Sequence, residues 1–223
     1  AAIIEHNTSG IISPKKNNIT DPKALEGKKY GTWNDPVELA MIRSLVEKQG
    51  GDYNKIELVP NSDSNSITPL ENGVFDAAWI YYAWDGKLAE SMNLETNFFY
   101  LKDFDKKLDY YSPVIIANND YLKNNKEEAQ KVLRAIKKGY VYAIEHPEEA
   151  ADILIKNAPE LKEKRDFVVA SQKYISQQYA SNKEHWGEFD AERWNAFYRW
   201  VNENKIIEKP LADNTGFSND YIK

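Results

Sequence analysis

The chain has 223 residues and a formal net charge of −6; 42% of its residues are hydrophobic and 29% are charged. This composition is that of a folded protein with one large domain or two small lobes, and it excludes a disordered chain. No block rich in Lys and Arg occurs, so the sequence predicts no nucleic-acid partner. The chain has no Cys, which excludes thiolate catalysis, disulfides and Cys-ligated metal.

Strands and helices alternate along the first half of the chain. The apolar runs predict strands at residues 2–4, 28–32, 56–59, 74–82 and 111–117. Polar segments between them predict turns or loops at 6–10, at 14–22, between 59 and 67, and at 101–109. This order predicts an open α/β sheet with parallel strands.

The clearest helix start in the sequence is at Asp35. Asp35 is a preferred N-cap residue, Pro36 suits the first helical position, and Glu38 falls at the capping-box position. Apolar residues then keep helical spacing as far as Gly50-Gly51, which predicts a helix that ends there.

The second half of the chain is predicted to be mainly helical. From residue 126, one apolar stripe recurs at helical spacing. It comprises Ala129, Val132, Leu133, Ile136, Tyr140, Ala143 and Ile144. Pro147 restarts a helix, and further helices are predicted over 167–179 and around 194–201.

Evidence for catalysis is weak. The three His residues, His6, His146 and His185, are not paired at metal-ligand spacing, and no nucleophile, phosphate-loop or zinc motif occurs. The sequence therefore predicts no catalytic residue, no metal site and no cofactor.

The segment 70–86 carries more information. Leu70 to Ala78 forms an L-x-x-G-x-x-D-A turn, which resembles the turn that leads into the interlobe cleft of type II periplasmic binding proteins. The run Trp79-Ile80-Tyr81-Tyr82-Ala83-Trp84-Asp85-Gly86 follows at once. Trp79 is expected in the core, whereas the residues after the strand end are expected at a ligand site, because open α/β sheets bind ligands at the carboxyl ends of their strands.

Five segments in the same order resemble one family. They are His6 to Gly10, Gly31-Thr32-Trp33 before Pro36 and Glu38, Trp79 to Gly86, Asp109 to Pro113, and Gly216 to Tyr221. The family comprises the solute-binding proteins for formylaminopyrimidine and hydroxymethylpyrimidine, together with the fungal enzyme that makes the thiamine pyrimidine. The resemblance runs through nearly all of the chain.

The resemblance implies a type II periplasmic-binding-protein-like fold with two three-layer α/β/α lobes. Residues 1–12 are then a hinge strand and remnant of lobe one, 13–108 are lobe two, and 109–223 return to lobe one. Family members carry a further N-terminal portion that is absent here, and since the chain begins with Ala1 we expect a processed, truncated or engineered start.

The implied function is capture of a thiamine-precursor pyrimidine by lobe closure, followed by docking on the membrane permease of an ABC importer. The protein is then not an enzyme. Its place is extracytoplasmic, in the periplasm or lipid-anchored as a lipoprotein at the outer face of the cell membrane.

An aminopyrimidine requires stacking faces, hydroxyl or amide groups, and a carboxyl group along one edge. Tyr82 and Trp84 are predicted to stack on the ring, and Trp33 to close over it. Asp85 is the first choice for the edge contact and Glu38 the second, although Glu38 is also explained as a helix cap and Asp85-Gly86 as a turn. The remaining predicted contacts are Asn7, Thr8 and Ser9 from the hinge, and Tyr110.

Two alternatives remain open from the sequence. One is an enzyme related to the fungal pyrimidine synthase, which requires a cluster of nucleophilic, His or Lys groups. The other is a binder of another small solute on the same fold, such as an alkanesulfonate or nitrate. Anionic ligands favour Arg or a helix N-terminus, and the predicted site is instead aromatic and acidic.

Overall fold

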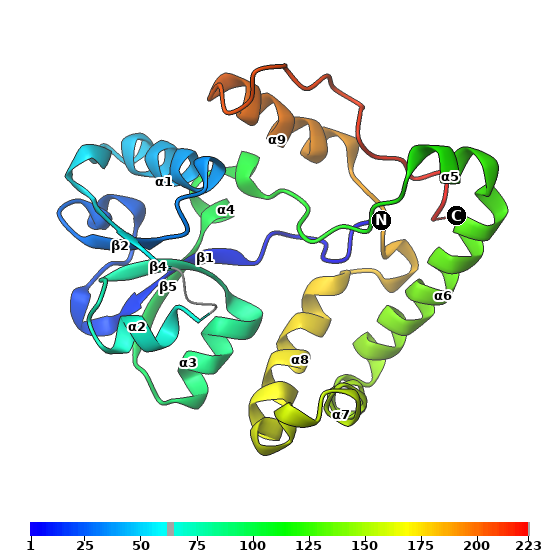
Figure 1. Cartoon of the computed structure of the whole chain (residues 1–223), viewed down its shortest axis with the longest axis horizontal. Coiled ribbons are helices and arrows are strands. Elements are labelled where there is room, and N and C mark those ends of the chain that lie inside the picture. The colour runs from blue at the N-terminus through cyan, green and yellow to red at the C-terminus, as the bar shows by residue number, and fades with distance from the viewer. Residues whose placement is uncertain (62–64, 223) are drawn as a thin grey trace. The chain divides into compact units, whose positions relative to one another are not determined.

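The structure, a computed structural model, describes residues 1–61 and 65–222 (Figure 1). Part of the loop predicted between residues 59 and 67 therefore lies outside the described residues. The chain divides into two units. Unit 1 consists of Ala1–Asn7, Asp109–Trp200 and Leu211–Lys223, and unit 2 consists of Thr8–Leu108 and Val201–Pro210.

A mixed five-stranded sheet forms the centre of unit 2, with the strand order β3-β2-β4-β1-β5. The strands are β1 (Ser9–Pro14), β2 (Lys29–Thr32), β3 (Glu57–Pro60), β4 (Ala77–Tyr81) and β5 (Thr96–Tyr100). β2 pairs in parallel with β3 and β4, but β1 is antiparallel to both β4 and β5. The prediction of a parallel sheet is therefore wrong for β1, because apolar periodicity carries no information on strand direction.

Several predicted boundaries in unit 2 also need correction. Ser9 and Gly10, predicted as part of a turn, are buried strand residues, because β1 has a hydrogen-bonded neighbour on each side. β5 was not predicted, and the strand predicted over 74–82 is limited to β4. The strand predicted over 111–117 is reduced to a single antiparallel bridge between Ala2 and Val114 in unit 1.

Helices cover both faces of this sheet, as Figure 1 shows. The helices of unit 2 are α1 (Pro36–Lys48), α2 (Ile67–Glu71), α3 (Lys87–Ser91) and α4 (Leu101–Phe104). Side chains from α2 and α3 pack with Ile12, Ala78 and Ile80 of the sheet in one buried cluster. The fold is thus the α/β layer arrangement that the sequence predicts.

Local signals set the ends of α1 as predicted. The Asp35 side chain accepts hydrogen bonds from the backbone N–H groups of Val37 and Glu38, at 2.9 and 3.1 Å. Pro36 occupies the first turn, and the helix ends before Gly50, whose φ of +73° lies in the left-handed region that favours glycine.

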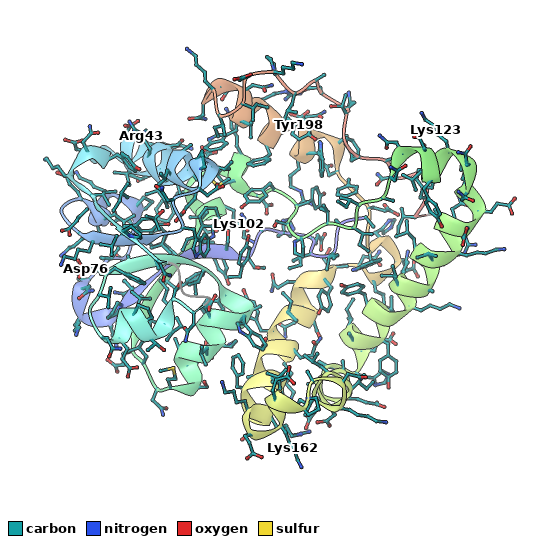
Figure 2. The ribbon with its side chains drawn as sticks, viewed as in Figure 1. Arg43, Asp76, Lys102, Lys123, Lys162 and Tyr198 are labelled. Carbon is teal, nitrogen blue, oxygen red and sulfur yellow. The ribbon has the colours of Figure 1, made fainter. Side chains whose placement is uncertain are left out.

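The turn before β4 depends on Asp76, the acidic residue of the L-x-x-G-x-x-D-A motif (Figure 2). One Asp76 carboxylate oxygen accepts from the backbone N–H of Lys29 at 2.9 Å, and the other accepts from the Asn17 side chain at 3.2 Å. These bonds align the start of β4 with β2. The motif is therefore explained by the architecture of the sheet.

Unit 1 is mainly helical, as predicted. It contains α5 (Asn119–Asn124), α6 (Lys126–Glu145), α7 (Pro147–Asn157), α8 (Arg165–Tyr179) and most of α9 (Ala191–Glu203). Trp186 is fully buried, stacks on Tyr140 at 4.5 Å between ring centroids, and donates its indole N–H to the carbonyl of Ile3 at 3.1 Å. Among the described residues, no helix has the length and hydropathy required to cross a bilayer.

Candidate ligand-binding site

Polar and aromatic residues gather at one edge of the sheet of unit 2. The carboxyl ends of the parallel strands β2 and β4 meet at this edge, and because β1 is antiparallel to β4, its amino end lies there too. Ser9 is paired with Tyr81, and the backbone N–H of Tyr82 donates to the carbonyl of Thr8 at 3.2 Å. The predicted site residues Thr8, Ser9 and Tyr82 are thus neighbours at the edge where α/β proteins bind ligands.

Two large indole rings are exposed after the strand ends. Trp33 follows β2 and Trp84 follows β4, and they are 49% and 43% exposed. Exposed Trp side chains of this size offer flat apolar faces to a ligand ring. Trp33 also contacts Trp79, with the ring centroids 6.1 Å apart and the planes tilted by 40°.

Trp79 has a feature that the sequence did not reveal. The side chain is buried, as predicted for a core residue, yet its indole Nε1 has no hydrogen-bond partner among the described residues. A buried N–H without a partner costs about 1–3 kcal/mol. Because Trp79 contacts Trp33, this unpaired donor belongs to the same group of residues.

Asp85 lies in the turn Tyr82–Gly86, a single π-helical turn between β4 and α3. Burial raises the pKa of its carboxyl group from 3.8 to about 6, although backbone hydrogen bonds at Tyr81 and Asp85 oppose the shift. Such π-turns occur often at functional sites. At pH 7 this carboxyl group is mostly ionised, but its protonated form, which can act as donor or acceptor, is far more accessible than for an ordinary Asp.

Tyr82 is held firmly by its neighbours. Its hydroxyl donates to Glu90 Oε1 at 2.6 Å, and its ring lies 4.6 Å from that of Phe98. Burial and the hydrogen bond to Glu90 raise the pKa of the phenol. A Cβ atom on Gly86 would lie 2.5 Å from the Tyr82 ring, so glycine is required at this close approach.

Glu38 is almost completely buried, with 2% exposure. Its carboxylate accepts hydrogen bonds from Tyr30 Oη at 2.8 Å, Thr32 Oγ1 at 2.9 Å and the backbone N–H of Trp33 at 3.1 Å. In a capping box the Glu38 side chain would also accept a hydrogen bond from the backbone N–H of Asp35. This second bond is not formed, so the capping-box prediction is only half right. The observed contacts of Glu38 hold Trp33 in place, and its predicted contact with a ligand stays a prediction.

The other two predicted contacts, Asn7 and Tyr110, belong to unit 1. Asn7 is fully buried, and its backbone N–H donates to Asp109 Oδ1 at 2.9 Å. The Tyr110 ring stacks on Phe197 with the centroids 4.4 Å apart.

Asp109 is the centre of a charged cluster in unit 1. Its Oδ2 lies 2.6 Å from His6 Nδ1 and 3.3 Å from Arg193 Nη1. Burial by itself would raise the pKa of Asp109. Hydrogen bonds from the His6 side chain and the Asn7 backbone N–H, together with the charges of His6 and Arg193, instead hold this pKa below its usual value. Asp109 thus ties the chain segment of residues 6–7 to the segment that begins at residue 109.

Metal binding has no support in the residues described. Across 1–61 and 65–222, no group of three or more acidic or His side chains is arranged to hold a metal ion.

Comparison with solved structures defines the class of fold. A ligand-binding component of an ABC-type import system from Staphylococcus aureus, solved with zinc bound, has a TM-score of 0.65 at 15% identity, over 99% of this chain and 72% of that chain. The alkanesulfonate-binding protein SsuA from Xanthomonas axonopodis pv. citri, bound to MOPS, has a TM-score of 0.63 at 12% identity, over 95% and 70%. The desulfurization enzyme DSZB has a TM-score of 0.61 at 12% identity, over 99% and 75%. The fold is that of the periplasmic binding proteins.

Sequence comparison then identifies the family. The family described as NMT1/THI5 like matches residues 1–150, so the chain belongs to this family. A formylaminopyrimidine-binding protein from Halalkalibacterium halodurans is 21% identical over 220 residues, which are 98% of this chain. The match spans 66% of the length of that relative.

Proposed function

We propose that this protein is the extracytoplasmic solute-binding component of an ABC importer and that it captures a thiamine-precursor aminopyrimidine. The observation that carries the proposal is the carboxyl group of Asp85, which lies next to the exposed Trp84 in the turn after the carboxyl end of β4. Membership in the NMT1/THI5-like family and the similarity to a formylaminopyrimidine-binding protein support this choice of ligand.

The chemistry of Asp85 suits an aminopyrimidine. Such a ring presents an amino donor next to a ring-nitrogen acceptor. A protonated carboxyl group donates to the ring nitrogen through its hydroxyl and accepts from the amino group through its carbonyl, which makes a two-point contact. With a pKa of about 6, Asp85 takes up the required proton at little cost near neutral pH.

The remaining contacts complete a site for a flat heterocycle. Trp33 and Trp84 provide apolar faces for stacking, and Trp79 supports the ring of Trp33 from below. Thr8 and Ser9 provide polar groups at the same edge. Asn7, Tyr82, Tyr110 and Glu38 remain predicted contacts.

The same features argue against an alkanesulfonate as the ligand. A sulfonate is a permanent anion, and an ionised Asp85 would repel it, whereas anion sites usually provide Arg or a helix N-terminus. The likeness to SsuA is a likeness of fold at 12% identity. A sulfonate is therefore the appropriate negative control.

Our proposal assigns the protein a transport role and no catalytic step. The enzyme DSZB shares the fold, so the fold by itself does not separate a binder from an enzyme. Capture by lobe closure, docking on a permease and a lipid anchor are further parts of the proposal. Small-angle X-ray scattering with and without ligand would test closure, which requires a smaller radius of gyration in the bound state.

Titration calorimetry tests the choice of ligand. The panel is formylaminopyrimidine, hydroxymethylpyrimidine, thiamine and an alkanesulfonate. We expect an aminopyrimidine to bind and Trp84→Ala and Asp85→Ala to abolish the binding, while Asp103→Asn, a change of an exposed acid on α4, leaves it intact. Tight binding of the sulfonate without binding of any pyrimidine would overturn the proposal.

A further inference from the structure

The middle of α6 carries only positive charges. Residues 129–144 contain no Asp and no Glu, but they contain Lys131, Arg134, Lys137 and Lys138. The chain as a whole has a formal net charge of −6, so this concentration of positive charge is local. The cations are spread along the sequence, and the helix gathers them together.

Three of these cations share one face of the helix. Lys131, Arg134 and Lys138 have i, i+3 and i+7 spacing, which brings them to the same side of an α-helix. All three are exposed, and none of them forms an ion pair with a described residue. Leu133 and Ile136 lie on the other side of α6, where they line a cavity that none of the three cations contacts. We call the surface formed by Lys131, Arg134 and Lys138 the basic face.

The acidic residues of α6 lie at its two ends. Glu127 and Glu128 are in the first turn, where the helix dipole favours acids. Glu145 is the last residue of the helix and is paired with Lys183. Because the acids stand at the ends, they do not neutralise the basic face.

Small residues lie among the cations. Ala135 and Gly139 are both exposed. A Cβ atom on Gly139 would meet no atom within 4 Å, and Gly139 is not among the glycines with positive φ. Glycine weakens a helix interior relative to alanine, so the isolated fold gives no reason for glycine here. Gly139 instead leaves room for a partner to approach the helix backbone between the cations.

An exposed aromatic residue extends the same side of α6. Tyr142 lies one turn beyond Lys138, and it is 37% exposed. Tyrosine is enriched where proteins meet the boundary between lipid and water, because its ring is apolar and its hydroxyl group is polar. Cations beside an exposed aromatic ring are typical of a surface that contacts a membrane.

We propose that the basic face of α6 binds the headgroups of an anionic phospholipid membrane. This inference rests on the proposed function, which places the protein at the outer face of the cell membrane. Each Lys or Arg close to an anionic surface strengthens binding roughly fivefold, so the three cations contribute about a hundredfold. Binding of this strength is reversible. It would supplement a lipid anchor, because stable anchoring requires two signals.

A flat membrane suits the basic face better than an acidic polypeptide does. Polypeptide segments are usually bound in a groove or along a strand edge, whereas the basic face is the convex side of a single helix. The acids elsewhere on the chain repel an anionic membrane, but only over short distances. At about 0.1 M salt the Debye length is about 10 Å, so the local charge of the basic face decides the interaction.

Cosedimentation with vesicles tests the proposal. The full chain is mixed at about 0.1 M salt with vesicles of phosphatidylcholine, with or without phosphatidylglycerol. We expect binding only to the vesicles that contain phosphatidylglycerol, and loss of this binding at about 1 M salt. A variant that combines Lys131→Glu, Arg134→Glu and Lys138→Glu should bind at least about a hundredfold more weakly.

A matched control separates the basic face from overall charge. Lys156, Lys162 and Lys164 are exposed residues of α7 and of the 3-10 turn Pro159–Lys164, and Lys162 is labelled in Figure 2. Changing all three to Glu alters the net charge by the same amount as the basic-face variant does. This control should bind the vesicles within about threefold of the wild type, because its changes lie outside the basic face. Circular dichroism confirms that each variant is folded.

Vesicle binding and ligand capture are measured independently. The vesicle assay contains no pyrimidine, and titration calorimetry with an aminopyrimidine is repeated on both triple variants. We expect both variants to keep the affinity of the wild type. Failure of the calorimetry with the wild type would overturn the proposed function, whereas failure of the vesicle assay would overturn only the role of the basic face.

Three results would overturn the inference. One is that the wild type does not bind vesicles with phosphatidylglycerol, or binds phosphatidylcholine equally well. Another is that the control variant loses as much binding as the basic-face variant, which would show that overall charge is responsible. The third is binding to polyglutamate, without binding to vesicles, that the basic-face variant loses. That result would assign the face to an acidic protein segment.

Discussion

Asp85→Asn tests the central physical claim about the site. Burial raises the pKa of Asp85 from 3.8 to about 6, which is a shift of about two pKa units. Each unit corresponds to 1.36 kcal/mol, so the ionised carboxylate opposes folding by at most about 3 kcal/mol above pH 6. Asp85 is only partly buried, and we therefore expect about 2 kcal/mol.

The sign of the effect depends on pH. Between pH 3.8 and about 6 the folded state binds more protons at Asp85 than the unfolded state does, so the stability of the wild-type protein falls as pH rises through this window. Asn carries no charge at any pH. Asp85→Asn is therefore expected to match the wild-type stability near pH 3.5 and to exceed it by about 2 kcal/mol near pH 7.5.

Urea unfolding followed by circular dichroism, repeated across this pH range, measures the difference. The matched control is Asp103→Asn, which removes an exposed acid from the same unit and should change little. A variant that is no more stable than the wild type near pH 7.5, or a difference that does not change with pH, would refute the claim that burial raises the pKa of Asp85.

The same substitution connects stability to binding. Asn keeps a donor and an acceptor in the positions of the protonated carboxyl group, so Asp85→Asn should be more stable and still bind the aminopyrimidine, whereas Asp85→Leu lacks both groups and should bind at least tenfold more weakly. Full affinity of Asp85→Leu would place the ligand elsewhere.

Three further predictions concern neighbouring contacts. Trp79→Phe keeps an aromatic ring but removes the buried, unpaired indole N–H, so we expect urea unfolding to show no loss of stability. Gly86→Ala places a Cβ atom 2.5 Å from the Tyr82 ring, and urea unfolding should show a loss of about 1–3 kcal/mol. Asp109→Asn removes a carboxylate whose pKa is lowered in the folded state, so its contribution is present above the unfolded pKa and lost as pH falls through the folded value. The expected loss is about 1 kcal/mol near neutral pH, and an equal loss under strongly acidic conditions would contradict this explanation.

Local sequence signals predicted the elements that depend on adjacent residues. Asp35 and Pro36 set the start of α1, and helical periodicity predicted α6 and most of the helices of unit 1. The sequence also predicted that Trp84 and Asp85 follow the end of a strand, and the structure places them in the turn after β4. These predictions succeeded because capping and periodicity act over one or two turns of the chain.

The tertiary structure decided the features that depend on pairing between distant segments. The antiparallel direction of β1, the hydrogen bonds of Glu38 with Tyr30 and Thr32, and the unpaired indole of Trp79 have no local signature. The same holds for the α6 stripe. Its apolar residues form an amphipathic face, as predicted, but a sequence period does not show how far that face is buried, and Ala129 is the one buried residue of α6.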